Sequence, residues 1–201
     1  GIMNSELIRN DFPILKTKVG GHQIVYFDNA ATTQRPLPVV NAVLDYTTHE
    51  NGNPHRGAHI FAISASEAYD TSKEVVRDFI HARSEKEIIY TRNTSESLNL
   101  VARSYGETHL KAGDHILITI AEHHSNLVTW QRVAQKTGAT LDYIYVDKET
   151  GHFPEEELKK IDDPRVKLFA FAEVSNVLGI DFDPKPLIQR AHAHGAIVVL
   201  D

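Results

Sequence analysis

Residues 196–201 read Ala-Ile-Val-Val-Leu-Asp and directly follow Ala-His-Ala-His-Gly at 191–195. Apolar residues that end in a single carboxylate predict a buried strand with Asp201 at its carboxyl end. In open α/β sheets, ligands bind at that edge of the sheet. A carboxylate in this position can face a cationic ring nitrogen or a metal ion. We expect residues beyond Asp201 to be needed to complete the site that this carboxylate serves.

This strand is the last of a regular alternation of strands and helices. Strands are predicted over 88–91, 115–120, 141–146, 166–172 and 196–200, and helices over 94–105, 126–136, 154–161 and 186–194. Alternation of this kind indicates parallel βα units with right-handed crossovers. The sequence therefore predicts an α/β fold with a mostly parallel sheet and flanking helices.

The residues before this alternation predict an N-terminal arm. A helix is expected over 4–10, a short strand over 24–27, and a helix from Pro36 or Pro38 to about His49. Asn51-Gly52-Asn53-Pro54 is a strong turn signal, and a long helix is predicted over 64–82. We expect an arm at 1–51 and the first part of a larger domain at 52–201.

The composition argues against several function classes. A net charge of −6 disfavours nucleic acid or an acidic membrane surface as the main partner. No run of eighteen apolar residues predicts a membrane span, and the first residues do not resemble a signal peptide. The sequence contains no cysteine, so this segment has no disulfide, thiolate metal site or thiol nucleophile. A cytosolic location is the default expectation.

A polar loop, Thr-Arg-Asn-Thr-Ser-Glu-Ser at 91–97, lies between a predicted strand and a predicted helix. Hydroxyls and free amides at a helix N-terminus form an anion site, which predicts phosphate binding by Thr94 and Ser95. The alternative is a simple helix cap, with Thr94 at the cap and Ser97 at the third helical position. The two interpretations are compatible with the same geometry.

Two further loops follow predicted strands. His123, in Ala-Glu-His-His-Ser-Asn at 121–126, can stack on a ligand ring, transfer protons or bind a metal. Asn176, in Val-Ser-Asn-Val-Leu-Gly at 174–179, offers both a donor and an acceptor. The alternatives are a loop histidine without a function and a turn asparagine kept for backbone reasons.

The candidate ligand-binding residues are all predicted to lie in the same part of the sheet. Thr94, Ser95, His123, Asn176 and Asp201 all follow predicted parallel strands, so they are expected at one edge of one sheet. A phosphate cradle, a stacking histidine, an amide and a carboxylate suit a phosphorylated aromatic cofactor with a basic ring nitrogen, which describes pyridoxal phosphate. Neither a GxxxxGK[ST] nor a GxGxxG motif is present, which disfavours a nucleotide-binding enzyme.

The segment Asn-Pro-His-Arg-Gly-Ala-His at 53–59 is a weaker candidate. His55 and His59 would share a face in a helix and could then bind zinc. No carboxylate follows at the zincin spacing and the Pro-Arg-Gly context favours a loop, so no metal site is expected. Arg56 suits bidentate recognition of a carboxylate, and the alternative is a solvated basic turn.

Five motifs occur in order: Tyr-Phe-Asp-Asn-Ala-Ala-Thr-Thr at 26–33, His-Arg-Gly-Ala-His at 55–59, Glu-His-His-Ser-Asn at 122–126, Val-Ser-Asn-Val-Leu-Gly at 174–179 and Ala-His-Ala-His-Gly-Ala at 191–196. In this series the chain resembles class V aminotransferase-fold enzymes, specifically the SufS-type (group II) cysteine desulfurases and the related selenocysteine lyases. The resemblance covers nearly the whole chain but only the front half of such an enzyme.

The resemblance implies a PLP-dependent transferase of fold type I, truncated here, that forms a homodimer at full length and acts in the cytoplasm. It implies conversion of L-cysteine to L-alanine, with the sulfur held as an enzyme persulfide. A sulfur-acceptor protein then receives it for iron–sulfur cluster assembly. A selenocysteine lyase acting on L-selenocysteine, another class V enzyme, or a non-catalytic truncated module are the alternatives.

The resemblance also assigns roles at the cofactor. Thr94 and Ser95 match the phosphate-binding loop. His123 matches the histidine that stacks on the ring and takes part in proton transfer. Asn176 matches an asparagine beside the ring substituents, and Asp201 matches the partner of the ring nitrogen.

Four residues match substrate-side segments. Ala30 and Ala31 match a loop near bound substrate, and His55 and Arg56 match a segment near the mouth of the active site. Some residues depart from the family pattern. Asn93 replaces a glycine and could strain a positive-φ position, and Glu173 replaces a histidine and adds negative charge.

The most serious departure concerns residues that the family places downstream of Asp201. They are the lysine that binds the cofactor covalently, the persulfide cysteine and the arginine that binds the substrate carboxylate. We therefore expect residues 1–201 alone to be inactive.

Overall fold

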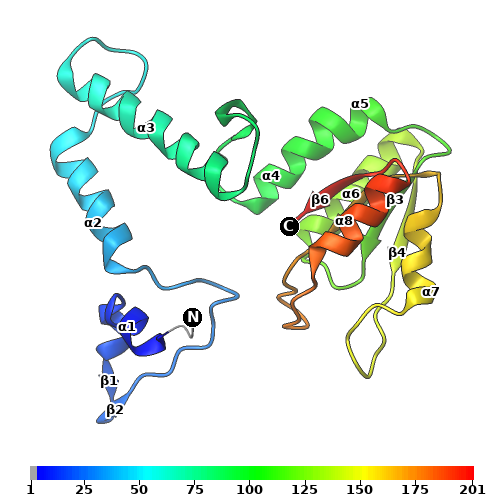
Figure 1. The fold of residues 1–201 in the computed structure, drawn as a ribbon, viewed down its shortest axis with the longest axis horizontal. Coiled ribbons are helices and arrows are strands. Elements are labelled where there is room, and N and C mark those ends of the chain that lie inside the picture. The colour runs from blue at the N-terminus through cyan, green and yellow to red at the C-terminus, as the bar shows by residue number, and fades with distance from the viewer. Residues whose placement is uncertain (1–3) are drawn as a thin grey trace. The chain divides into compact units, whose positions relative to one another are not determined.

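The computed structural model describes residues 4–201, which divide into two compact units, residues 4–89 and 90–201 (Figure 1). We call them unit 1 and unit 2 and describe each by itself. The predicted division into an arm at 1–51 and a larger domain at 52–201 stays a prediction.

Unit 1 begins with helix α1 (Ser5–Asn10), whose first amides bond to the Asn4 side chain. A 3-10 turn (Pro13–Lys16) leads to a small antiparallel hairpin of β1 (Lys18–Val19) and β2 (His22–Gln23). Gly20 and Gly21 form its turn with φ of 58° and 82°, a backbone conformation that glycine adopts without strain.

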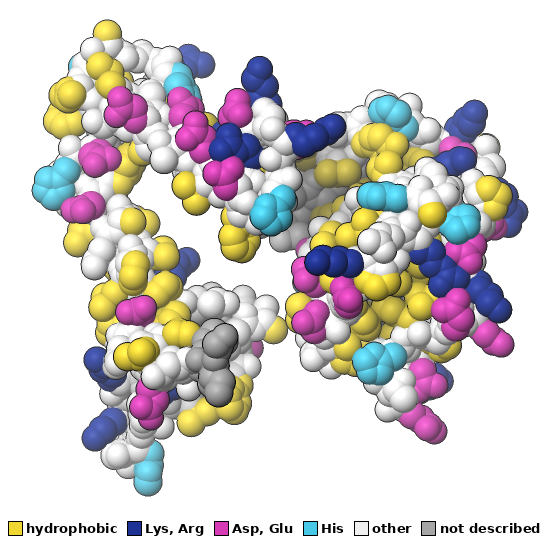
Figure 2. Space-filling model, in the orientation of Figure 1, with side chains coloured by type: hydrophobic (Ala, Val, Ile, Leu, Met, Phe, Trp, Pro, Cys, Tyr) yellow, Lys and Arg dark blue, Asp and Glu magenta, His cyan; other side chains and the backbone are white. Residues whose placement is uncertain are grey.

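Two helices make up most of the rest of unit 1. Helix α2 (Leu37–Asp45) continues as a π-helical turn (Tyr46–Glu50), and α3 (Ile60–Phe79) precedes a short 3-10 turn (Glu85–Glu87). Among residues 4–89, the buried apolar side chains are Ala62, Ala65 and Ile88. Many hydrophobic side chains of these helices are exposed, as the space-filling view shows (Figure 2). Unit 1 therefore has little hydrophobic core of its own.

Unit 2 is built on a parallel sheet in the order β4-β3-β5-β6. Its strands are β3 (His115–Thr119), β4 (Thr140–Ile144), β5 (Val166–Phe171) and β6 (Ile197–Leu200). Its helical segments are α4 (Thr94–Val101), a π-helical turn (Ala102–Gly106), α5 (Glu107–His109), α6 (Ser125–Thr137), α7 (Glu155–Leu158) with a 3-10 turn (Lys159–Asp162), and α8 (Pro184–Ala193).

The sheet separates two hydrophobic clusters, because successive strand side chains point to opposite faces. Ile116 and Ile118 of β3 pack with Trp130 of α6 on one face. Leu117 of β3 packs on the other face with Phe169 of β5 and Leu187 of α8. Figure 1 shows α6 and α8 on opposite sides of the sheet. The arrangement is a three-layer α/β unit, as the alternating sequence predicts.

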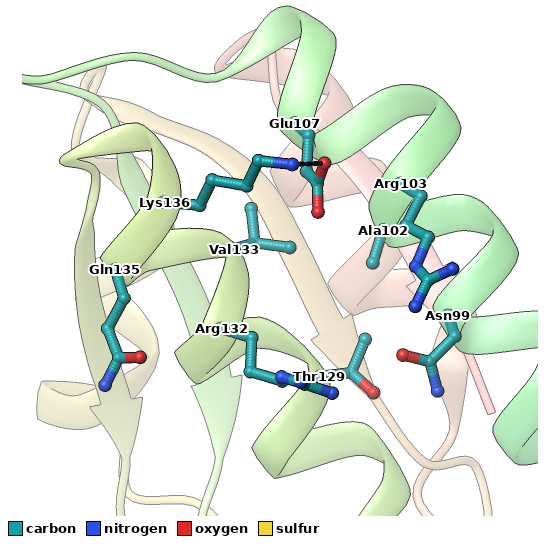
Figure 3. Close-up of a pocket in the computed structure, with 9 residues that line it drawn as sticks. All are labelled: Asn99, Ala102, Arg103, Glu107, Thr129, Arg132, Val133, Gln135 and Lys136. Atoms are coloured by element: carbon teal, nitrogen blue, oxygen red, sulfur yellow. Dashed lines mark hydrogen bonds and ion pairs between the residues drawn. The ribbon is translucent and has the colours of Figure 1, made fainter.

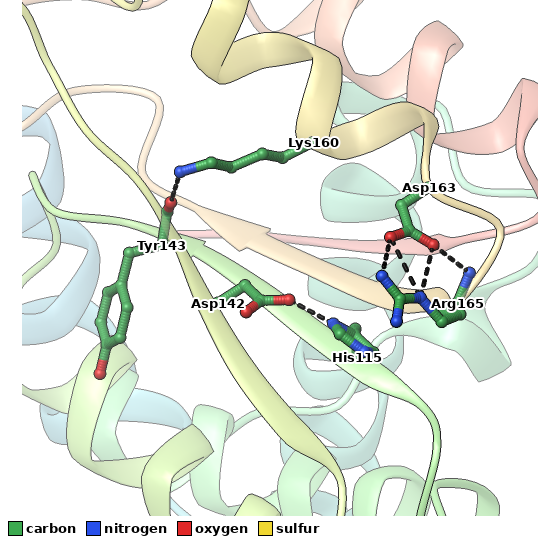
Figure 4. Close-up of polar contacts among 6 residues, drawn as sticks. All are labelled: His115, Asp142, Tyr143, Lys160, Asp163 and Arg165. Carbon is green, nitrogen blue, oxygen red and sulfur yellow. Dashed lines mark hydrogen bonds and ion pairs between the residues drawn. The ribbon is translucent and has the colours of Figure 1, made fainter.

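Polar pairs lie at the strands and at the turn before β5 (Figure 4). His115 at the start of β3 contacts Asp142 of β4, and Lys160 Nζ donates to the backbone carbonyl of Tyr143 at 2.8 Å. Arg165, just before β5, makes a two-nitrogen contact with Asp163, with its Nη2 at 2.7 Å from Oδ2. These polar side chains have hydrogen-bond partners within the unit, so we assign them a structural role and not a ligand-binding one.

Most predicted elements of unit 2 are confirmed within a few residues. Two predicted strands, one in unit 1 and one at the boundary between the units, are wrong. Residues 24–27 and 88–91 are irregular, because neither segment pairs with another strand among residues 4–201. The hairpin of unit 1 lies just before 24–27 instead. The long helix predicted over 64–82 runs from Ile60 to Phe79, starting where the His59 side chain accepts from the amide of Ala62. Within the described part of the chain, no helix is long and apolar enough to cross a membrane.

Candidate functional site

Asp201 lies directly after β6, at the carboxyl edge of the sheet. Its amide donates to the carbonyl of Phe171 at 2.9 Å, and its carbonyl accepts from the amide of Glu173 at 3.0 Å. Burial raises the pKa of the Asp201 carboxyl, and the nearby His123 partly offsets this. A partly desolvated carboxylate beside a histidine is suited to a cationic ligand group. The predicted position of Asp201 is confirmed.

His123 lies in the loop between β3 and α6, on the same edge. Its Nδ1 accepts from the amide of Ser125 at 3.1 Å and contacts the Ser125 hydroxyl at 2.8 Å. A backbone amide can only donate, so the neutral ring carries its proton on Nε2. The side chain is exposed, which leaves its ring available to a ligand.

Glu122, the residue before His123, is buried among hydrogen-bond donors. Its Oε1 accepts from the Thr119 hydroxyl and from the amide of Ala172 at 3.1 Å, and its Oε2 accepts from Asn126 Nδ2 at 2.7 Å. Burial raises the pKa of the Glu122 carboxyl most, these hydrogen bonds lower it, and the charge of Asp201 raises it. Glu122 therefore lies within electrostatic range of Asp201.

Asn176 lies in an exposed loop that folds back on itself between β5 and α8. The loop closes through bonds from the Ser175 amide to Ile180 O at 3.0 Å and from the Phe182 amide to Glu173 O at 2.7 Å. The buried Ser175 hydroxyl donates to Ala121 O at 2.9 Å. This hydrogen bond attaches Ser175, the residue before Asn176, to the loop that carries His123. Glu173, which departs from the family pattern, is exposed at the base of the loop.

Thr94 and Ser95 are the first two residues of α4, but Asn93 rather than Thr94 caps the helix. The Glu96 amide donates to Asn93 Oδ1 at 2.9 Å, so the predicted Thr94 cap is wrong. Asn93 has φ of −168°, so the strain expected from its replacing glycine is absent. The amides of Thr94 and Ser95 lie outside the intrahelical pattern and can bind an anion.

The route by which Thr94 and Ser95 reach the site also differs from the prediction. No strand lies directly before them, because 88–91 is irregular. Packing of α4 on α6 brings Ser95 to the site instead: Ser95 and His123 line one hollow of about 310 Å³ together with Arg132, and Thr94 does not line this hollow. An adjoining hollow of about 600 Å³ lies between α4 and α6 (Figure 3). Arg132 of α6 and Arg103, in the turn just after the end of α4, point into it and give it positive charge.

The residues of unit 2 fit a ligand with a cationic ring and an anionic group. Asp201 offers a partly desolvated carboxylate, His123 an exposed ring, and the start of α4 free amides beside Arg132. These are the groups that pyridoxal phosphate needs for its ring nitrogen, its ring face and its phosphate. No cluster of side chains among residues 4–201 could hold a metal ion.

The four substrate-side residues belong to unit 1. Ala30 and Ala31 lie in an exposed turn that the Tyr26 hydroxyl braces by donating to Thr32 O at 2.7 Å. His55 has φ of 61°, its amide donates to Ser66 Oγ at 2.8 Å, and its Nε2 lies 3.0 Å from Asp70 Oδ1. Arg56 beside it is exposed. The substrate-binding role of these residues stays a prediction.

Sequence reasoning missed the buried polar residues behind the site. Glu122 reads as part of a loop motif, and neither Asn126 nor Trp130 stands out in an apolar helix face. The spacing of Asn126 and Trp130 could have predicted their contact, because residues four apart in a helix lie on the same face. In the structure, Trp130 Nε1 donates to Asn126 Oδ1 at 2.8 Å. Only the fold shows that the Ala172 amide completes the same group.

Comparison with known proteins gives a consistent result. The family described as aminotransferase class-V matches residues 25–201. A probable cysteine desulfurase of Synechocystis sp. is 45% identical over 194 residues, which are 96% of this chain and 46% of that protein. Another from Halalkalibacterium halodurans is 45% identical over 199 residues, 99% of this chain and 49% of that protein. The chain thus spans about half the length of these curated relatives.

Solved structures of cysteine desulfurases are also similar to this chain. The apo cysteine desulfurase of Thermococcus onnurineus is similar with a TM-score of 0.86 and 38% identity, covering 100% of this chain and 48% of that one. A cysteine desulfurase of Escherichia coli gives a TM-score of 0.79 and 32% identity, covering 100% and 49%. The PLP-dependent fold expected from the sequence is confirmed, as a portion of the full-length fold. This chain belongs to the class V aminotransferase family, whose members of the cysteine desulfurase type depend on pyridoxal phosphate.

Proposed function

We propose that this chain is the N-terminal part of a pyridoxal phosphate-dependent cysteine desulfurase of the SufS type. The main supporting observation is that His123 and Asp201 both lie at the carboxyl edge of the sheet, where burial raises the pKa of the Asp201 carboxyl and His123 partly offsets this. The similarity to cysteine desulfurases over nearly the whole chain supports the reaction class. The substrate proposed is L-cysteine, and the products are L-alanine and a persulfide on the complete protein.

In this proposal, different residues of unit 2 bind different parts of the cofactor. Asp201 binds the ring nitrogen and keeps it protonated, and His123 stacks on the ring. Thr94 and Ser95 bind the phosphate at the start of α4, and Asn176 bonds to a ring substituent. When bound, pyridoxal phosphate supplies an electron-withdrawing ring that weakens bonds at the substrate α-carbon. His123 can hold or pass a proton there through Nε2, because its Nδ1 accepts from the Ser125 amide and the side chain is exposed.

On the substrate side, Ala30, Ala31, His55 and Arg56 contact L-cysteine in this proposal. The complete protein is proposed to act as a cytoplasmic homodimer that passes sulfur to an acceptor protein for iron–sulfur cluster assembly. These statements rest on the family resemblance.

The test uses the full-length protein that contains this sequence. It is loaded with pyridoxal phosphate, given L-cysteine, and assayed for L-alanine and for protein-bound sulfur. We expect both products in equal amounts before an acceptor is added, and continued turnover with a reductant or an acceptor protein. Failure to bind the cofactor, or binding without release of alanine, would contradict the proposal. L-Selenocysteine in a parallel assay separates a desulfurase from a selenocysteine lyase.

A further inference from the structure

The buried carboxylate of Glu122 joins three segments of unit 2. Thr119 is the last residue of β3, Asn126 lies in the first turn of α6, and Ala172 directly follows β5. All three donate to this one carboxylate, two of them at 2.7 and 3.1 Å. Glu122 and Ala172 are 50 residues apart in the sequence. The contact therefore exists only because β3 and β5 are neighbours in the sheet.

The direction of every hydrogen bond in this cluster is fixed by chemistry. The Trp130 indole N–H can only donate, so the side-chain oxygen of Asn126 must accept from it. The Asn126 amide nitrogen then points to Glu122 Oε2 and must donate. The Ala172 amide can only donate to Oε1. Both carboxylate oxygens are consequently required as acceptors.

A protonated Glu122 would fit this arrangement poorly. Its added proton would need an acceptor, and the only candidate among its partners is the Thr119 hydroxyl. That oxygen already accepts from the amide of Ala121 at 3.3 Å, and its own proton would lose the carboxylate as partner. No buried side-chain polar atom among residues 4–201 lacks a partner, so the ionised arrangement is fully satisfied.

The joined segments carry the candidate cofactor residues. His123 is bonded directly to Glu122 in the chain. Asp201 pairs with Phe171, the residue before Ala172, through the bond from its amide to the Phe171 carbonyl. One side chain thus fixes the loop of His123 relative to the strand end beside Asp201. Polar groups held in one geometry place a ligand better than groups that must be ordered on binding.

We propose that Glu122 is an ionised positioning residue that ties the β3 end, the β5 end and the start of α6 together, and so holds His123 and Asp201 at the spacing that pyridoxal phosphate needs. The cofactor part of this statement rests on the proposed function. The tie itself is a property of the protein without ligand.

The first variant is Glu122→Gln in the full-length protein. Glutamine keeps the shape but replaces one acceptor oxygen by an NH₂ group. That group must face either the Asn126 amide nitrogen or the Ala172 and Thr119 donors, so one donor is left without an acceptor. Because hydrogen bonds to charged groups are the strong ones, we expect the dissociation constant for pyridoxal phosphate to rise roughly tenfold or more.

The decisive variant is the exchanged pair Glu122→Gln with Asn126→Asp. The glutamine at position 122 would still accept from Thr119 and Ala172 through its carbonyl oxygen. Its NH₂ group would now donate to the new carboxylate at position 126, which would also accept from Trp130. Every hydrogen bond is restored and the charge moves by one side chain. We expect the exchanged pair to recover most of the cofactor affinity lost in Glu122→Gln.

A readout without cofactor keeps this inference separate from the proposed function. Trp130 is the only tryptophan of this sequence, and its indole N–H reports on Asn126 directly and on Glu122 through it. In the unloaded protein, assigned with Trp130→Phe, the indole NMR signal should exchange faster with solvent in Glu122→Gln and return to slow exchange in the exchanged pair. The matched control is Glu157→Gln, since Glu157 also accepts from a backbone amide and a side chain, but beside β4.

The outcomes are distinct. The proposal is supported if Glu122→Gln weakens cofactor binding and speeds solvent exchange of the Trp130 indole N–H, if the exchanged pair restores both, and if Glu157→Gln changes neither. It is also supported if the single variant fails to fold while the exchanged pair folds and binds. It is overturned if Glu122→Gln behaves like the parent, or if the exchanged pair is as impaired as the single variant. If the parent protein binds no pyridoxal phosphate, the proposed function fails, while the indole result still decides the tie.

Discussion

The hydroxyl of Ser175 donates to the backbone carbonyl of Ala121 at 2.9 Å and links two loops that are 54 residues apart in the sequence. The same oxygen accepts from the amides of Val177 and Leu178 at 3.3 and 3.1 Å. Ser175 and Ala121 are both buried, so water cannot replace the bond between them. The position of Asn176 against the His123 loop therefore depends on the hydroxyl of its neighbour.

Replacing Ser175 by alanine should destabilise unit 2 and loosen this loop. The change leaves a buried carbonyl and two amides without their partner, which costs about 1–3 kcal/mol. Chemical denaturation of the full-length protein measures the loss. Ser104→Ala is the matched control, because Ser104 donates to Leu100 O on an exposed helix face, and it should change stability by less than about 0.5 kcal/mol. Equal effects of the two variants would contradict the prediction.

Replacing Asp201 by asparagine should weaken binding of pyridoxal phosphate by roughly tenfold to a hundredfold, since a charge-assisted contact worth about 1.5–3 kcal/mol is lost. Absorbance titration of the unloaded full-length protein with the cofactor gives the dissociation constant. Asp147→Asn is the control, because Asp147 caps a turn by accepting from the amides of Glu149 and Thr150. An unchanged dissociation constant for Asp201→Asn would remove Asp201 from the cofactor site.

Truncating Phe169 should be among the most damaging core changes. Phe169 is fully buried in β5 and stacks on Phe171 with ring centroids 4.7 Å apart. Phe169→Ala leaves a cavity between the sheet and α8 and should cost about 3–5 kcal/mol. Phe169→Leu keeps most of the volume and should cost clearly less in the same denaturation experiment. Similar losses for both variants would show that the cavity is not the cause.

Stability should fall below about pH 4 in part through Asp163. Its side-chain hydrogen bonds to Arg165 lower the pKa of the Asp163 carboxyl to about 2, from an ordinary value of 3.8 (Figure 4). A lowered folded-state pKa stabilises the fold above pH 3.8, and that stabilisation is lost as the pH falls toward 2. Melting temperatures between pH 5 and 2 should decline less steeply in Asp163→Asn than in the parent. Because the Asp163–Arg165 pair lies at the surface, we expect a small difference, and parallel curves would exclude this carboxyl as a contributor.

A polypeptide of residues 1–201 alone is expected to release no alanine from L-cysteine. The family resemblance implies that the lysine and the persulfide cysteine follow Asp201 in the full-length protein, and this sequence has no cysteine to hold the sulfur. Borohydride treatment with pyridoxal phosphate should give no adduct at a single defined lysine. The full-length protein is the positive control, and robust turnover by residues 1–201 would contradict the prediction.

The sequence alone predicted most of unit 2, because its strands are mostly apolar and alternate with helical segments. The strands from His115 to Leu200 and the position of Asp201 follow from this local pattern. The segments 24–27 and 88–91 show the limit. A short apolar run becomes a strand only when another strand pairs with it, and neither segment has such a partner among residues 4–201.

What the sequence by itself determined is the order of parallel βα elements and the residue types at their ends, since those depend on periodicity and on turn chemistry. Tertiary structure alone decided that Ser95 reaches His123 through packing of α4 on α6. It also decided that the amide of Ala172 meets the carboxylate of Glu122 across 50 residues. The physical reason is that a buried polar group must be hydrogen-bonded, and its partners often belong to segments far away in the sequence. The spacing of residues along the chain does not show which distant segments the fold brings together.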